Sequence, residues 1–181
     1  MWGTTKTERM KSHAPTNIRI RSATNKDTDR IKALVFGVLA EYGWTAGQRA
    51  TDLDLDDIEG NYLCTGGLFE LIEDIQGNLL GTVGLYPLTR EICELRKMYF
   101  VPEIRGKGLG KYILERTIDN ARRLGFKRIE LETASVLKAA EHLYVEYGFK
   151  PMQREGLAPR CDQAFYLDLL PRRSHESEQA G

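Results

Sequence analysis

Hydrophobic and polar residues alternate along several short runs of this chain, a pattern typical of half-buried strands. The alternation is clearest at residues 17–21 and 128–133. Gln76-Gly77-Asn78 predicts a hairpin turn. Other runs are rich in aliphatic and aromatic residues and are bounded by turn-forming residues, which also predicts strands; these runs are 67–74, 79–88, 91–101 and 164–169.

Longer runs carry apolar residues three and four positions apart, the spacing that gathers them on one face of a helix. The acidic run 52–57 is interleaved with leucines and predicts a short helix that continues to Leu63, with its acids complementing the helix dipole. The other predicted helices each end near a glycine; they lie around 31–39 before Gly43, at 109–124 before Gly125, and at 136–147 before Gly148.

The order of these elements predicts an α/β protein of the α+β sandwich type, with a mixed, mostly antiparallel central sheet flanked by helices. The helix at 109–124 links two strands that can lie parallel through a right-handed crossover. The length of 181 residues predicts one domain, at 17–170, between a disordered tail at 1–16 and a polar tail at 171–181.

Composition excludes several classes of protein. Lys plus Arg equals Asp plus Glu at 26 each, which argues against a broad nucleic-acid-binding surface. The three cysteines are isolated and the three histidines are dispersed, so the sequence predicts free thiols and no metal site. We see neither an apolar run of membrane-spanning length nor a signal-peptide core, and we expect a cytoplasmic protein without a membrane partner.

The chemistry of the chain centres on a glycine-rich turn, Arg105-Gly106-Lys107-Gly108-Leu109-Gly110, between a strand and a helix. Unpaired N–H groups of the first helical turn and the positive end of the dipole favour an anion. Arg105, Lys107 and Lys111 add positive charge, so we interpret the turn as a pyrophosphate cradle. The spacing matches neither the nucleotide P-loop nor GxGxxG. A turn that serves only the backbone is the alternative.

Residues 101–110 resemble the acetyl-CoA signature Arg/Gln-x-x-Gly-x-Gly/Ala of the GNAT superfamily of N-acetyltransferases. Residues 139–149 are similar to the helix of that family that ends in Leu-Tyr-x-x-x-Gly-Phe. The resemblance extends over residues 18–170, nearly the whole chain. It implies that acetyl-CoA is a cosubstrate whose pyrophosphate binds the glycine turn. It also implies that N–H groups near Met98, Tyr99 and Phe100 contact the pantetheine and the acetyl carbonyl.

The resemblance also suggests catalytic residues. Glu94 matches a general-base glutamate of the family; the alternatives are an exposed carboxylate paired with Arg96 or Lys97, or a proton that leaves through water. Strict alternation would place Glu94, Arg96 and Met98 on one face of the strand. Arg96 can clamp a carboxylate of the acceptor or serve as an ion-pair partner.

Tyr144 matches the family tyrosine that lies near the coenzyme sulfur, where a phenol can protonate the departing thiolate. The alternative is a core tyrosine with a bonded hydroxyl. Many relatives carry Asn seven residues earlier to contact coenzyme A, whereas this chain has Leu137. Arg160 and Asp162 are candidate acceptor contacts. A covalent route through Cys161 has no histidine near it in sequence, so we favour direct attack in a ternary complex.

These residues predict an acetyl-CoA-dependent N-acetyltransferase that acts on a primary amine of a small molecule, an amino acid or a peptide. Dimers are common in the resembling family, which makes a homodimer one expectation. The alternative from another class is a coenzyme A-binding regulatory module without catalysis. Such a module has no need of both Glu94 and Tyr144, so their presence favours an enzyme.

Overall fold

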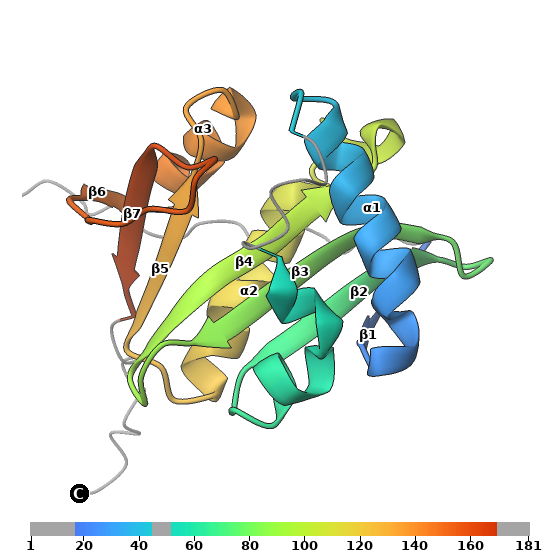
Figure 1. Cartoon of the computed structure of the whole chain (residues 1–181), viewed down its shortest axis with the longest axis horizontal. Coiled ribbons are helices and arrows are strands. Elements are labelled where there is room, and N and C mark those ends of the chain that lie inside the picture. The colour runs from blue at the N-terminus through green and yellow to red at the C-terminus, as the bar shows by residue number, and fades with distance from the viewer. Residues whose placement is uncertain (1–16, 45–51, 170–181) are drawn as a thin grey trace, which may run out of the picture.

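The computed structural model describes residues 17–44 and 52–169, and its centre is one seven-stranded sheet (Figure 1). Every neighbouring pair of strands is antiparallel except β4 and β5. This architecture confirms the predicted α+β class and the parallel pair. In the sheet order β1–β2–β3–β4–β5–β7–β6, the strands are β1 (Ile18–Ser22), β2 (Leu68–Asp74), β3 (Leu79–Pro87), β4 (Ile92–Phe100), β5 (Arg128–Thr133), β7 (Gln163–Asp168) and β6 (Lys150–Met152).

Helices cover both faces of the sheet. In Figure 1, α1 (Thr28–Ala40) crosses the front of β2 and β3, α2 (Leu109–Arg123) lies behind the sheet, and α3 (Lys138–Glu146) sits beyond the end of β5. Two hydrophobic clusters follow from this layering. One joins α2 to the back of the sheet, and the other joins α1 to its front. The described residues also form short helical turns: η1 (Asn25–Asp27), η3 (Leu53–Asp56), η4 (Glu59–Leu63) and η5 (Pro102–Ile104).

The α2 helix forms where its sequence predicts. Ile113, Leu114 and Ile118 recur at helical spacing and are buried against the sheet, while charged residues cover the outer side. Gly125 ends the helix with φ +91°, a conformation that costs glycine least. Packing against the sheet therefore sets the position of the helix, and its N-terminus lies near the end of β4.

The predicted helix over 52–63 is wrong in type. The chain instead forms the 3₁₀ turn η3 and the single π-helical turn η4. Asp57 separates them with φ −142° and ψ +84°, and its Oδ1 accepts hydrogen bonds from the Gly60 N–H and from Asn25 Nδ2. The aspartates favour local capping over a continuous helix, as short acidic side chains commonly do.

Alternation along β4 is interrupted by a bulge. Pairing with β3 shifts between Thr82 and Gly84, and Lys97 takes φ +54°. The Thr82 hydroxyl donates a hydrogen bond of 2.7 Å to the Lys97 carbonyl, which holds the bulge. Our prediction that Met98 shares a face with Glu94 is therefore wrong, because the extra residue inverts the alternation. Met98 packs against the α2 side of the sheet, whereas Tyr99 packs against the α1 side.

The parallel pairing of β4 and β5 is short. It covers three positions and stops at Glu94 opposite Glu130, although β4 continues to Phe100 and β5 continues to Thr133. Beyond this point β5 pairs only with β7. The two central strands thus part in the middle of the sheet, which opens space between them.

The remaining predicted strands and helices lie within a few residues of the observed ones, apart from β6, which was not predicted. The β6 strand has three residues, with Pro151 at its centre, and gives no alternation to detect. The predicted tails and most of the 43–50 loop lie outside the described residues. Among the described residues, we find no helix that is long and apolar enough to cross a membrane.

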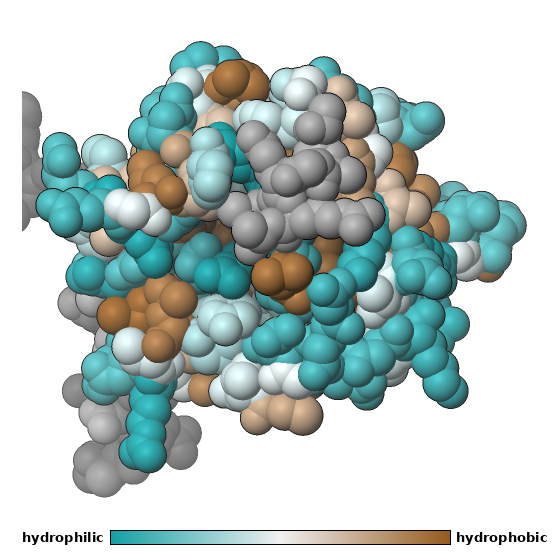
Figure 2. Space-filling model, in the orientation of Figure 1, coloured by the Kyte–Doolittle hydropathy of each residue, from teal (hydrophilic) through white to brown (hydrophobic). Residues whose placement is uncertain are grey.

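The face seen in Figure 2 is mostly hydrophilic, and its hydrophobic side chains are scattered. Isolated exposed hydrophobic residues are ordinary on soluble domains, so this view alone indicates no interface. A homodimer therefore stays a prediction. Among residues 17–44 and 52–169, the exposed large hydrophobic residues are Tyr42, Leu53, Ile75, Leu124, Val136 and Val145.

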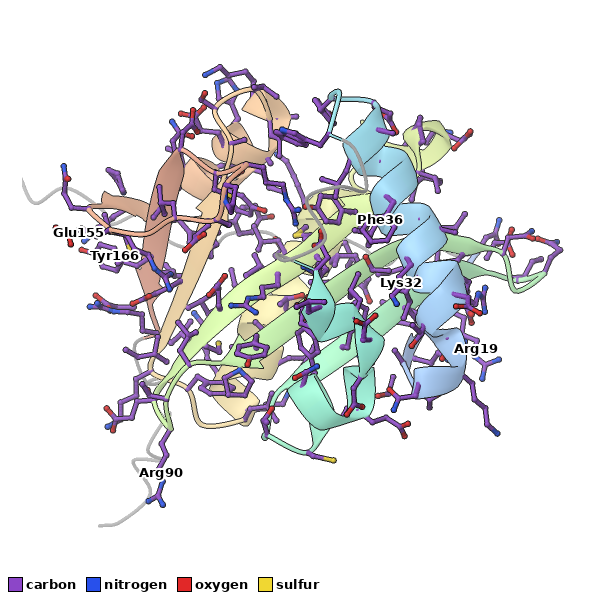
Figure 3. The ribbon with its side chains drawn as sticks, viewed as in Figure 1. Arg19, Lys32, Phe36, Arg90, Glu155 and Tyr166 are labelled. Atoms are coloured by element: carbon purple, nitrogen blue, oxygen red, sulfur yellow. The ribbon has the colours of Figure 1, made fainter. Side chains whose placement is uncertain are left out.

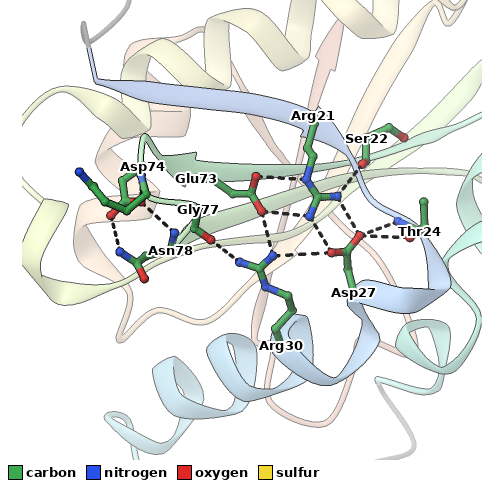
Figure 4. Close-up of polar contacts among 10 residues, drawn as sticks. Arg21, Ser22, Thr24, Asp27, Arg30, Glu73, Asp74, Gly77 and Asn78 are labelled. Atoms are coloured by element: carbon green, nitrogen blue, oxygen red, sulfur yellow. Dashed lines mark hydrogen bonds and ion pairs between the residues drawn. The ribbon is translucent and has the colours of Figure 1, made fainter.

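A polar cluster ties the front helix to the β1 edge of the sheet (Figure 4). The Arg21 guanidinium donates two hydrogen bonds to Asp27, at 2.9 and 2.7 Å, and two to Glu73, at 3.1 and 3.0 Å. Arg30 joins from α1 by donating to Glu73 and to the Gly77 carbonyl. Hydrogen bonds from Arg21 lower the pKa of Asp27 to about 2.

We expect Asp27→Asn to lower the free energy of unfolding by ~2 kcal/mol at pH 7, because it removes a carboxylate whose folded pKa is depressed. The contribution is present above the unfolded pKa of about 4 and is lost as the pH falls toward 2. Urea unfolding at pH 7 and pH 2.5 would measure it. The exposed Asp29→Asn change is the control, and an equal loss from both variants would contradict the assignment.

Candidate functional site

A groove of about 990 Å³ opens where β4 and β5 part. Its walls are β4, the glycine turn, the end of β5, α3, the C-terminal end of α1 and the loop between β6 and β7. Of the residues predicted from the sequence to form a site, those that line the groove are Glu94, Arg96, Met98, Tyr99, Phe100, Arg105, Gly106, Gly108, Gly110, Lys111, Tyr144 and Arg160.

Within the part of the chain that the structure describes, no strand lies beside the edge of β4 that faces the groove. Among the described residues, β4 pairs with β5 only through Glu94, so the segment from Leu95 to Phe100 borders the groove on that side. Backbone N–H and C=O groups need partners, and an extended ligand can supply them in place of a strand. This stretch can therefore bind an amide-containing chain lengthwise.

The glycine turn forms the end of the groove next to α2. Gly106 has φ +73° and Gly108 has φ +83°, and added Cβ atoms would meet nothing within 4 Å. The glycines are thus required by backbone conformation and not by crowding. Gly108 is the N-cap of α2 and makes no side-chain cap, so the first N–H groups of the helix can bind an anion.

Two of the three basic side chains around the turn, those of Arg105 and Lys111, already have carboxylate partners. Arg105 donates to Glu41 at the end of α1 through both terminal nitrogens, at 2.6 and 2.8 Å, and its Nε donates to the Phe100 carbonyl. Lys111 pairs with Glu146 of α3 at 2.7 Å. Lys107 and Leu109 are outside the lining, and Leu109 is part of the buried core. Anion binding here depends first on backbone N–H groups.

Glu94 lies at the point where the strands part. Its carboxylate is largely buried and accepts two hydrogen bonds from Arg96, at 3.0 and 3.1 Å. Arg96 also stacks over the Tyr86 ring, with its Cζ 4.1 Å from the ring centroid. The guanidinium is thus held by Glu94 and Tyr86. The ion-pair interpretation of Arg96 fits these contacts better than a clamp on a ligand.

A buried ionic group closes one side of the groove. Asp52 accepts two hydrogen bonds from Arg160, at 2.8 and 2.7 Å, and one from Lys97 at 2.6 Å. Asp54 lies 3.1 Å from the Lys97 ammonium and accepts a hydrogen bond from the Tyr62 hydroxyl. Burial acts to raise the pKa of Asp52, but the two bases outweigh it and lower that pKa. The bulge at Lys97 directs its side chain to this carboxylate.

Tyr144 brings a buried phenol to the groove. Burial raises its pKa, and Tyr99 adds to the effect, so the hydroxyl stays protonated across the physiological range. Its ring packs against Phe149, with centroids 5.6 Å apart. Within residues 17–44 and 52–169, we find no hydrogen-bond partner for its hydroxyl. Burial likewise raises the pKa of Tyr99 to about 12.

Cys161 also lines the groove, and burial raises the pKa of its thiol to about 11. Asp162 lies outside the lining, because both of its carboxylate oxygens accept hydrogen bonds from Ser135, at 2.7 and 2.6 Å. The thiol is therefore protonated at neutral pH, and Asp162 shapes the loop that precedes β7. Neither geometry supports a cysteine nucleophile or a direct contact with a ligand by Asp162.

Sequence reasoning missed several residues that line the groove, among them Glu132 at the end of β5 and Arg154 between β6 and β7. Arg154 lies 3.8 Å from Glu94, 3.5 Å from Glu130 and 3.2 Å from Glu132. The signal for Glu132 was present, since two glutamates alternate along a central strand where burial makes charge costly. No sequence signal indicated Arg154. Within the described part of the chain, no cluster of metal-ligating side chains occurs.

Comparisons with known proteins agree on one family. Residues 38–149 match the family model described as Acetyltransferase (GNAT) family. The chain is 40% identical over 145 residues to YjgM of Escherichia coli (strain K12), an uncharacterized N-acetyltransferase, covering 78% of this chain and 87% of that protein.

Solved structures show the same fold. A GNAT-family acetyltransferase from Staphylococcus aureus superposes with a TM-score of 0.75 at 25% identity, covering 84% of this chain and 99% of that one. The yncA protein of Salmonella typhimurium, solved with its cofactor acetyl-CoA, gives a TM-score of 0.66 at 23% identity, with 92% and 100% covered. These results confirm the resemblance drawn from residues 101–110 and 139–149.

We expect the thiols to differ sharply in reactivity. Cys64 is exposed, whereas burial raises the pKa of Cys161 to about 11. Because the thiolate is the reactive form, alkylation of Cys161 at pH 8 should be about 100-fold slower than that of an ordinary exposed thiol. Peptide mass mapping after timed iodoacetamide treatment would measure this. Equal labelling of Cys64 and Cys161 would contradict the assigned protonation and reopen the covalent cysteine route.

Proposed function

The chain belongs to the acetyltransferase (GNAT) family, and we propose that it transfers an acetyl group from acetyl-CoA to a primary amine of a small molecule, an amino acid or a peptide. The proposal rests chiefly on one observation: an unpaired edge of β4 leads directly to an uncapped helix start with two left-handed glycines. Both features border the same groove.

Two parts of the groove offer hydrogen-bonding groups that match acetyl-CoA. The N–H groups of Gly106 to Lys111 suit a diphosphate, and the open edge at Met98 to Phe100 suits the amides of pantetheine. Acetyl-CoA supplies an acetyl thioester to the reaction. N–H groups of β4 can polarise its carbonyl oxygen, since fixed donors beside a developing negative charge stabilise it.

Removal of a proton from the acceptor amine falls to Glu94 or to water that it orders. The carboxylate borders the groove at the place where β4 leaves β5. Its two hydrogen bonds from Arg96 fix its orientation. Both carboxylate oxygens therefore already accept a hydrogen bond from a neighbouring side chain. This arrangement favours transfer through ordered water over direct abstraction by Glu94.

Return of a proton to the thiolate is assigned to Tyr144. The phenol is buried and lines the groove, and it is neutral at physiological pH, as a tyrosine is with or without the rise in pKa that burial causes. A neutral acid with no competing acceptor among the described residues can donate to a thiolate as it forms. The protonated Cys161 thiol supports direct attack by the amine in a ternary complex.

A regulatory module that binds coenzyme A without turning it over is the second candidate. Its support is the set of ion pairs that already satisfies Arg96, Arg105 and Arg160. The buried carboxylate of Glu94 and the buried phenol of Tyr144, which both line the groove, favour the enzyme. A binding module gains nothing from holding either group away from water.

We expect Tyr144→Phe to lower kcat about 100-fold with little change in the KM for acetyl-CoA, because it removes an acid and leaves the ring. Release of coenzyme A thiol with a panel of amines would measure this. Tyr147→Phe is the matched control on the same helix end, since its hydroxyl donates to Glu115 and does not line the groove.

One outcome would count against an enzyme, and another would count against the role of the Tyr144 phenol. Tight acetyl-CoA binding with no turnover on any amine would favour the regulatory module. Equal activity of the native protein and Tyr144→Phe would remove the phenol from the reaction and leave the protonation of the thiolate to water.

We expect Gly108→Ala to weaken coenzyme A binding about tenfold by calorimetry, since φ +83° costs ~1 kcal/mol or more for a residue with a Cβ and displaces the first N–H groups of α2. Gly125→Ala is the matched control, because it places the same strain, at φ +91°, at the other end of that helix. Similar losses of affinity in both variants would show that general destabilisation is the cause.

A further inference from the structure

Three glutamates converge on one guanidinium beside the groove. Glu94 of β4 faces Glu130 of β5 in the sheet register, and Glu132 follows two positions later on the same face of β5. Arg154 lies within 4 Å of all three carboxylates. Their side chains are between 8% and 12% exposed, so water screens the charges poorly.

These charges do not balance locally. Arg96 is committed to Glu94 through two hydrogen bonds, which leaves Arg154 alone to serve Glu130 and Glu132. Three carboxylates against two guanidinium groups leave one excess negative charge. Partly buried charges that lack a counter-ion are costly, so this place favours one further cation.

Arg154 leaves part of its hydrogen-bonding capacity unused. Its Nη1 is buried and makes no hydrogen bond within the described residues, and its nearest carboxylate there is 3.5 Å away. By contrast, the Ala158 N–H donates a hydrogen bond of 2.9 Å to Glu132 Oε2, which fixes that carboxylate at the groove wall. The Glu132 carboxylate is therefore held in place and can bind a cation, while Arg154 is a loosely held counter-ion.

The basic side of the groove is differently arranged. Lys97 and Arg160 also border it, but both are drawn onto Asp52, and their side chains are only 5% and 10% exposed. An acceptor with a carboxylate next to its amine would therefore add a negative charge beside the three glutamates. Lys97 and Arg160 would not offset that charge, because both are already paired with the buried Asp52.

We propose that Glu132 determines acceptor specificity by binding the ammonium of the acceptor, together with Glu94, and that it selects amines without a neighbouring free carboxylate. This inference rests on the proposed N-acetyltransferase function and narrows its acceptor class. Alkylamines, amino alcohols and amino groups whose carboxyl is bound in an amide fit the site. Free α-amino acids do not.

The test compares leucinol with leucine, which share a side chain and differ by hydroxymethyl against carboxylate. In the native protein, we expect kcat/KM for leucinol to be at least about tenfold higher than kcat/KM for leucine. Repulsion between the carboxylate of leucine and one poorly screened glutamate is enough for a factor of that size. Glu132→Gln keeps the hydrogen bond from Ala158 and removes the charge, so the preference should fall toward parity. Arg154→Gln should increase it, because the excess negative charge grows.

Glu155→Gln is the matched control, since Glu155 adjoins Arg154 in sequence, is exposed and does not line the groove. Figure 3 shows Glu155 at the β6 edge of the sheet, away from β4. This variant should keep the native preference. Opposite shifts from Glu132→Gln and Arg154→Gln are a signature that general loss of structure would not produce.

A native preference for leucine, or one unchanged in Glu132→Gln, would overturn the inference. If neither compound is acetylated, the proposed function fails on these acceptors, and calorimetry on the protein with coenzyme A decides the inference by itself. Tighter binding of leucinol that weakens in Glu132→Gln would support the ammonium site. Equal binding of the two compounds would refute it.

Discussion

The separation of β4 from β5 after Glu94 is the constraint on which the groove depends. A central strand that loses its neighbour leaves a row of peptide groups without partners, and such a row persists only if water or a ligand satisfies it. The chain confines this cost to a short segment. The Lys97 bulge, held by the Thr82 hydroxyl, changes the direction of β4 while its pairing with β3 resumes at Tyr99.

The same bulge organises the chemistry around the groove. Glu94 and Arg96 face the α1 side by ordinary alternation, and the bulge brings Lys97 and Tyr99 to that same side, with Met98 and Phe100 toward α2. Charged and phenolic groups thus collect on one side of the strand. Apolar contacts collect on the other, where they join the core under α2. One irregular residue therefore separates the reactive side of β4 from its packing side.

Sequence reasoning succeeded where local physics decides the outcome. The periodicity of 109–124 and the glycines around it fixed α2 and its N-terminus, and alternation located most of the strands. It failed where distant residues decide. Lys97 has no intrinsic preference for a left-handed conformation, and Arg154 meets its glutamates only through tertiary structure. The acidic run at 52–57 misled because an aspartate can stabilise a helix dipole or cap a turn, and only the partners of Asp57 decide between the two.

The bond between Arg105 and Glu41 has a consequence for ligand entry. The glycine turn and the end of α1 belong to different parts of the chain, and this pair joins them beside the groove, which Arg105 lines. An incoming anion that binds Arg105 must displace Glu41. Its binding free energy then includes only the difference between the new ion pair and the one that is broken. The released carboxylate would then sit beside the bound anion and repel it. Binding of an anion through Arg105 would thereby break the link between the glycine turn and the end of α1.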